Sequence, residues 1–246
     1  MTSPVTYDLQ GQIARITLDD GKANIMNLAM LTAISSAFDQ AERDKAVVLF
    51  SSGRPGLFSA GFDLKVFAVN DAEGSYAMVR AGAELALKLL TFPLPIVTAC
   101  AGHAYPMGAF LILASDIRLA ARGAWRIGFN EVAIGIAVPS FALEIGRQRL
   151  APAWLSRAAV TGEMFGPEDA LAAGFFDRLV DPADLDAEAA AAAEAAARLH
   201  LPSHKSTKLR LRAVAMAAVR AAIDAELTLD AYQSRGPSTV RLPGAA

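Results

Sequence analysis

The spacing of apolar residues changes several times along the first half of the chain. Every second side chain is apolar over residues 12–18, which predicts a half-buried strand. After Asn27, a residue type that caps helices, apolar residues recur at helical spacing over residues 31–41. Similar reasoning predicts strands at residues 46–52, 95–102, 116–121 and 124–130, helices at 72–91 and 107–115, and a glycine- and proline-containing loop at 52–61. Strands and helices mixed in this way predict an α/β fold.

The pattern becomes mainly helical after Pro139. Residues 185–232 are rich in alanine and carry larger apolar residues on repeating faces, which predicts closely packed helices. The last stretch, residues 234–246, contains two prolines and two glycines and is expected to be irregular. The chain therefore divides into a mixed α/β region, residues 1–184, and a helical region, residues 185–246, that caps the fold or contacts other subunits.

Composition narrows the classes of ligand. The formal net charge of -2 gives no reason to expect nucleic acid as a ligand, because proteins that bind nucleic acid usually carry a basic face. Cys100 is the single cysteine, so an internal disulfide and a cysteine-built metal site are both excluded. Charged residues and glycines interrupt every apolar run before it reaches the length of a membrane span, and the N-terminus does not resemble a secretory signal. These features predict a cytoplasmic protein with a small-molecule ligand.

Three segments contain the candidate chemistry. FSAGFDLK, residues 58–65, and GHAYPMGAFLILASD, residues 102–116, each place small residues before a predicted helix. Such turns leave backbone N–H groups free, and two converging N–H groups form an oxyanion hole. The third segment holds Glu131 in an otherwise apolar run. A carboxylate that folding removes from water is either paired for structural reasons or retained because it transfers protons.

These segments, in this order, resemble the crotonase superfamily, which is also called the enoyl-CoA hydratase and isomerase family. The downstream pattern LSRAAVTGEMFGPEDALAAGFFDRLV extends the likeness, which covers residues from about 5 to 232. The resemblance implies an α/β spiral of repeated ββα units over residues 1–184, followed by a helical C-terminal region. It further implies acyl-CoA thioester ligands, assembly as a homotrimer or a dimer of trimers, and no cofactor other than the coenzyme A of the substrate.

Several positions match functional residues of that family. The backbone N–H groups of Phe62 and Met107 match the oxyanion donors, and Gly108 matches a glycine that lets the second helix start lie near the thioester. The residues that match coenzyme A contacts are Lys22, Ala23, Ala60, Asp63, Leu64 and Lys65.

The number of glutamates separates the reactions of the family. Hydratases of this family resemble one another in using two glutamates, since one carboxyl group activates water and the other delivers a proton. Phe110 stands at the first of these positions and Glu131 at the second. The run from Gly128 to Pro139 resembles the 3,2-trans-enoyl-CoA isomerase branch, in which one glutamate moves a proton between two carbons during unsaturated fatty acid breakdown. Phe110 is expected to belong to an apolar wall that excludes water.

Other interpretations of the same residues remain open. Glu144 could be a second acid, which would favour hydration, or the chain could be a paralogue that binds acyl-CoA without catalysis. Ser140, His103 and Asp116 are the residue types of a hydrolase triad, but no nucleophile-elbow spacing supports one.

The tract HKSTKLRLR is either a solvated basic face or a contact to coenzyme A phosphates. The basic residues to which these two interpretations apply are Lys205, Lys208, Arg210 and Arg212. Arg235 and Arg241 are candidates to replace the basic end of the C-terminal helix that many relatives carry.

Overall fold

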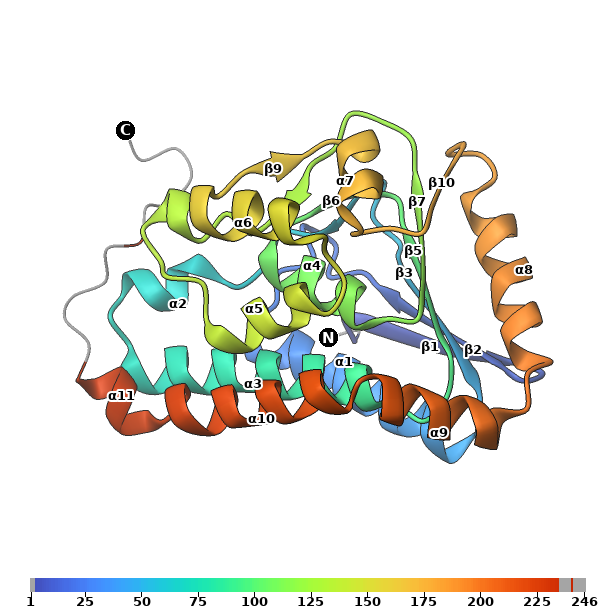
Figure 1. Cartoon of the computed structure of the whole chain (residues 1–246), viewed down its shortest axis with the longest axis horizontal. Helices are drawn as coiled ribbons and strands as arrows, with labels where there is room; N and C mark the ends of the chain where they lie inside the picture. Colours follow the sequence, from blue (N-terminus) through green and yellow to red (C-terminus); the bar gives the residue numbers. More distant parts are fainter. Residues whose placement is uncertain (1–2, 235–239, 241–246) are drawn as a thin grey trace.

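Two β-sheets form the centre of the computed structural model, which describes residues 3–234 and residue 240 (Figure 1). The larger sheet has six strands in the order β1 (Val5–Gln10), β2 (Ile13–Leu18), β3 (Val47–Ser52), β5 (Ile96–Cys100), β7 (Ile117–Ala121) and β10 (Arg178–Val180). The smaller sheet has four strands in the order β4 (Gly56–Ser59), β6 (Gly102–Ala104), β8 (Ile127–Gly128) and β9 (Met164–Phe165). The strands β1 and β9 run antiparallel to their neighbours, and the others pair in parallel.

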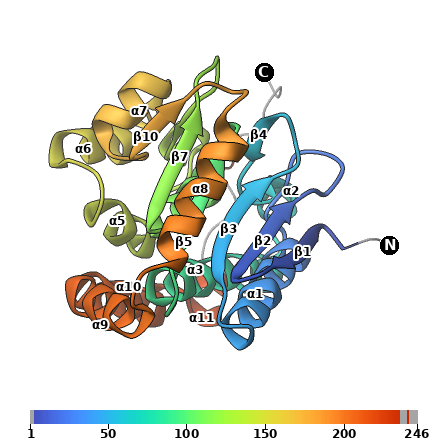
Figure 2. The ribbon, with the colours of Figure 1, turned by 90° about the vertical axis from the view of Figure 1, so that its right-hand side faces the viewer.

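Helices cover both faces of the larger sheet, and the alternation of side chains along each strand explains why. On β3, Val48 and Phe50 belong to the main core together with residues of α1 (Leu28–Arg43) and α3 (Ala72–Thr91). The intervening residues Val47 and Leu49 pack in a second cluster with α8 (Leu185–Ala197). Figure 2 shows α8 crossing in front of the sheet. A strand that is apolar at every position is typical of a parallel sheet buried on both faces.

The chain repeats a ββα unit, as the family resemblance predicted. β3 and β4 precede α2 (Leu64–Ala68) and α3, β5 and β6 precede α4 (Pro106–Ala114), and β7 and β8 precede α5 (Ser140–Arg147). In each unit the first strand joins the larger sheet and the second joins the smaller sheet.

The short strands of the smaller sheet differ from the sequence prediction. Residues 52–61 contain β4 rather than only a loop, residues 95–102 are split between β5 and β6, and the strand predicted at 124–130 shrinks to β8. Backbone contact, rather than a pattern of side chains, explains β4 and β6: a Cβ atom on Gly102 would lie 1.8 Å from the carbonyl carbon of Gly56. The strands β1, β9 and β10 were also not predicted, since each pairs at a sheet edge or is very short.

The remaining helices lie in two groups, one beside β9 and β10 and the other along α3 (Figure 1). They are α6 (Pro152–Thr161), α7 (Pro167–Ala173), α9 (Leu201–Leu211), α10 (Ala213–Glu226), α11 (Leu229–Gln233) and a single 3-10 turn, η1 (Val132–Ile134). α10 contacts both α3 and α5, and α11 contacts α3 (Figure 1). Within the described residues, no helix has the length and apolar character needed to cross a membrane. The tail predicted at 234–246, with Arg235 and Arg241, lies almost entirely outside the described residues.

A buried group of charges joins the helical region to the core. Asp116, at the start of β7, accepts hydrogen bonds from Lys208 Nζ at 2.8 Å and from the backbone N–H of Ile96 at 2.8 Å. Arg212 Nη2 lies 2.8 Å from Asp116 Oδ1, and Arg212 Nη1 donates to the carbonyl oxygens of Leu90 and Ala114. Burial lowers the pKa of Lys208 to about 8, and the nearby Asp116 carboxylate opposes this shift.

These contacts divide the basic tract in two. Lys208 and Arg212 are each only 5% exposed and neutralise Asp116, so the proposal that they contact coenzyme A phosphates is wrong for both. Lys205 and Arg210 are exposed.

We expect Asp116→Asn to lower the free energy of unfolding by about 3 to 5 kcal/mol, because it leaves two buried cations without their counter-charge. The matched control is Asp186→Asn, which breaks the exposed pair with Arg15 and should cost less than about 1 kcal/mol. Urea denaturation of both variants measures the difference. Equal losses of stability would contradict this role for Asp116.

Candidate active site

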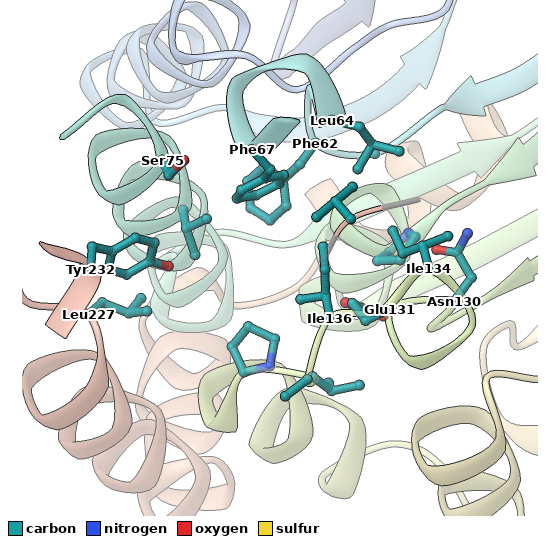
Figure 3. A pocket seen from close by; sticks show the side chains of 18 of the residues that line it. Phe62, Leu64, Phe67, Ser75, Asn130, Glu131, Ile134, Ile136, Leu227 and Tyr232 are labelled. Carbon is teal, nitrogen blue, oxygen red and sulfur yellow. The ribbon is translucent and has the colours of Figure 1, made fainter. Parts of the chain in front are cut away.

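Glu131 lies in the wall of a cavity of roughly 1170 Å³ that is lined by residues of the α/β region and of the helical C-terminal region (Figure 3). Phe62, Leu64 and Phe67 form one side of this cavity, and Leu227 and Tyr232 lie across it from Glu131 and Ile136. Most of these side chains are apolar, so the cavity suits a ligand with a hydrocarbon part.

The Glu131 carboxyl group is buried, and no described residue places a cation beside it. Glu131 is only 7% exposed, and its Oε2 has no hydrogen-bond partner within the described part of the chain. Burial raises the pKa of Glu131 to about 8, from an ordinary value of 4.5, and its own backbone N–H opposes only part of that shift. A purely structural carboxylate would be expected to have partners on both oxygens. The observed arrangement instead favours a group that takes up and releases a proton near neutral pH.

The backbone around Glu131 fixes its direction. Glu131 follows β8 and begins η1, which ends at Gly135 in the left-handed conformation with φ of 84°. The carbonyl oxygen of Glu131 accepts the N–H of Ile136 at 2.8 Å, which closes this turn. Glycine adopts this conformation at little cost. The glycine four residues after Glu131 therefore allows a tight turn that holds the glutamate.

The two predicted oxyanion donors come from neighbouring turns. The N–H of Tyr105 donates to the carbonyl oxygen of Ser59 at 2.9 Å, and this bond joins the turn after β4 to the start of α4. No described residue accepts a hydrogen bond from the N–H of Phe62 or of Met107. Met107 lies in the first turn of α4, where unpaired N–H groups are expected. Phe62 precedes α2, whose cap is Asp63, so its N–H is freed by the turn at Gly61 rather than by a helix start.

Not all of the predicted substrate contacts line the cavity. Ala60, Phe62, Leu64 and Glu131 do. Lys22 and Lys65 are exposed outside it. Asp63 accepts the N–H of Lys65 as the cap of α2, and the carbonyl oxygen of Ala23 accepts the N–H of Ala60.

Met107, Gly108 and Phe110 are buried and do not line the cavity. Phe110 packs edge-on against Phe129 and Phe141, with ring centroids 4.9 and 5.8 Å away, so it fills the core rather than the cavity wall. A Cβ atom on Gly108 would lie 2.9 Å from Cβ of Ser59, so its missing side chain makes room for β4 rather than for a thioester.

The alternative catalytic groups are not assembled. Glu144 pairs with Arg147 at 3.3 Å and does not line the cavity. His103 Nδ1 accepts the N–H of Arg126, and Asp116 is held by Lys208 and Arg212, so no triad forms with Ser140. The sequence analysis missed Glu226 and Tyr232, which line the cavity from the helical region, because no local motif marks either residue.

Comparison with known proteins agrees with this geometry. A family profile described as enoyl-CoA hydratase/isomerase matches residues 8–235. The chain belongs to the enoyl-CoA hydratase/isomerase family. The family and the crotonase fold predicted from the sequence motifs are therefore confirmed.

Relatives of this family member carry the names of two reactions. The chain is 30% identical over 205 residues to the mitochondrial enoyl-CoA delta isomerase 1 of Rattus norvegicus, which covers 81% of this chain and 70% of that protein. It is 33% identical over 171 residues to a probable enoyl-CoA hydratase of Bacillus subtilis, which covers 66% of this chain and 63% of the relative. A solved structure named as an apo enoyl-CoA isomerase from Mycobacterium tuberculosis is 43% identical, with a TM-score of 0.86, covering 91% of this chain and 97% of that chain.

We expect Glu131→Gln to become increasingly more stable than the wild type as the pH rises from 5 to about 8. In that range the unfolded glutamate ionises and the buried one does not, so the wild type loses roughly 1.4 kcal/mol of stability per pH unit. Below the ordinary pKa the two proteins should differ by a constant amount.

Denaturation of both proteins across this pH range measures the difference, with Glu144→Gln as the control. A gap that does not change with pH would show that Glu131 titrates like an exposed carboxyl group.

Proposed function

We propose that this protein isomerises 3-enoyl-CoA thioesters to trans-2-enoyl-CoA thioesters. The supporting observation is the buried carboxyl group of Glu131, which has no cation beside it among the described residues and lies in a cavity whose margin carries the unpaired N–H group of Phe62. The names of the isomerase relatives point in the same direction.

In the proposed first step the ionised Glu131 removes a proton from carbon 2 of the acyl group. The electrons of the broken C–H bond form a double bond between carbons 1 and 2, and the thioester oxygen becomes an enolate oxygen. The N–H group of Phe62 donates to this oxygen, and the second donor is the N–H group of Met107, whose side chain is buried but whose neighbour Pro106 lines the cavity. Loss of one such donor typically costs a hundredfold to a thousandfold in rate.

The second step returns the same proton to carbon 4. The thioester carbonyl re-forms, and the double bond now lies between carbons 2 and 3. Glu131 ends the cycle ionised, so one carboxyl group is sufficient. The proton shift leaves the oxidation state of the acyl group unchanged, so the proposed reaction needs no metal or redox cofactor, and coenzyme A enters only as part of the substrate.

Hydration is the alternative reaction. It differs from isomerisation in needing a second carboxyl group. The family resemblance matches Phe110 to the first hydratase glutamate, and the Phe110 side chain lies in the aromatic core. Glu226 also lines the cavity, but both of its oxygens accept hydrogen bonds from Ser140. This arrangement favours isomerisation over activation of water.

Assembly as a homotrimer or a dimer of trimers stays a prediction, which light scattering of the purified protein would test.

We expect Glu131→Gln to lower kcat for 3-enoyl-CoA isomerisation by about a hundredfold to ten-thousandfold, the range typical of a general acid or base. Glu144→Gln is the control and should keep the wild-type rate. The conjugated product absorbs in the ultraviolet, which gives a continuous assay. Rapid hydration of crotonyl-CoA by the wild type, with negligible isomerisation, would reject the proposed function, as would loss of activity in Glu144→Gln.

A further inference from the structure

One continuous segment connects Glu131 to helix α5. Every residue from Ile134 to Ser140 lines the cavity, so this segment, the catalytic-side wall, spans residues 134–140. Its first part is tied to the glutamate, since the carbonyl oxygen of Glu131 accepts the N–H groups of Ile134 and Ile136. A movement of the far end of this wall would therefore change the position of Glu131.

The opposite side of the cavity is built by the helical region. This C-terminal wall comprises the end of α10 and helix α11, residues 226–233, of which Glu226, Leu227 and Tyr232 face the cavity. It is attached to α3, because Arg80 Nη1 donates to the carbonyl oxygen of Leu227 at 2.7 Å. The rings of Tyr76 and Tyr232 also meet edge to face, with their centroids 5.9 Å apart.

Ser140 and Glu226 join the two walls. The backbone N–H of Ser140 donates to Glu226 Oε2 at 3.0 Å, and the Ser140 hydroxyl donates to Glu226 Oε1. Ser140 is the first residue of α5, and the preceding cap residue, Pro139, makes no side-chain hydrogen bond. A helix start favours a carboxylate, so Glu226 supplies from α10 the acceptor that a local cap residue would normally provide.

Resting on the isomerase function proposed above, we propose that Ser140 and Glu226 are positioning residues that set the spacing of the two walls and thereby select the size of the acyl group. The thioester oxygen is held at Phe62 and Met107, so the acyl chain must run from there between the walls. If the spacing of the walls changes, the acyl chain binds in a different position, and carbons 2 and 4 move relative to Glu131. A misplacement of about 1 Å can cost a hundredfold in rate.

Binding of saturated acyl-CoA thioesters tests this without requiring turnover. Calorimetry would compare butanoyl-, hexanoyl-, octanoyl-, decanoyl- and dodecanoyl-CoA on the wild type, Ser140→Ala and Glu226→Ala. Each added methylene that becomes buried should tighten binding roughly fourfold until the chain outgrows the space between the walls. In both variants the preferred chain length should shift by at least one member of the series.

Arg220→Gln is the matched control, because Arg220 lies on the same helix in exposed ion pairs with Glu84 and Asp224 and does not line the cavity. Its chain-length profile should equal that of the wild type. Kinetics should show that Ser140→Ala and Glu226→Ala each lower kcat by about tenfold with a smaller change in KM, and that the double variant resembles the single ones.

The outcomes are distinguishable. Folded variants with the wild-type chain-length profile and kcat would overturn this inference and leave the proposed function intact. Failure of the wild type to bind any acyl-CoA would overturn the proposed function, and this inference with it. If Glu226→Ala does not fold, Ser140→Ala gives the decision, because it keeps the backbone N–H and removes only the hydroxyl group.

Discussion

Keeping the Glu131 carboxyl group out of water requires free energy from the rest of the molecule. Among the described residues no cation lies beside it and one of its oxygens has no partner, so its burial costs free energy that the packing of the fold must supply. The turn from β8 through η1 to Gly135 gives it a fixed direction. The resulting rise in its pKa is what makes a carboxyl group suitable for taking and returning a proton near neutral pH.

The rigidity that holds this group comes from two kinds of packing. Gly102 lies close to the backbone of Gly56 and Gly108 lies close to the Ser59 side chain, which brings β4, β6 and the start of α4 together. Two unpaired N–H groups then lie in neighbouring turns. The buried pairs of Asp116 with Lys208 and Arg212 attach the helical region to the core at the opposite end of α10 from the cavity. Asp116 thus has two cations beside it, whereas no described residue places a cation beside Glu131, the proposed proton carrier.

Sequence reasoning predicted strands β2, β3, β5 and β7 of the larger sheet and the long helices, because side-chain periodicity marks them, and it predicted Asn27 as a cap from its residue type. It missed β4 and β6, since their pairing depends on absent side chains and on backbone distance. Phe110 was predicted to form part of the cavity wall, but it lies in the aromatic core because it packs against Phe129 and Phe141, which come from later in the chain. Glu226 reaches the cavity from 95 residues beyond Glu131 in the sequence, and no local pattern could reveal that contact.

The pH dependence of kcat/KM for 3-enoyl-CoA isomerisation tests most directly whether the buried Glu131 carboxyl group is the base, because this profile reports the ionisation of the free enzyme. The rate constant should rise with increasing pH as a single group ionises, with a midpoint near the pKa of about 8 that burial gives Glu131. A profile that is flat from pH 6 to pH 9, or one with its midpoint at the ordinary glutamate value of 4.5, would contradict this account.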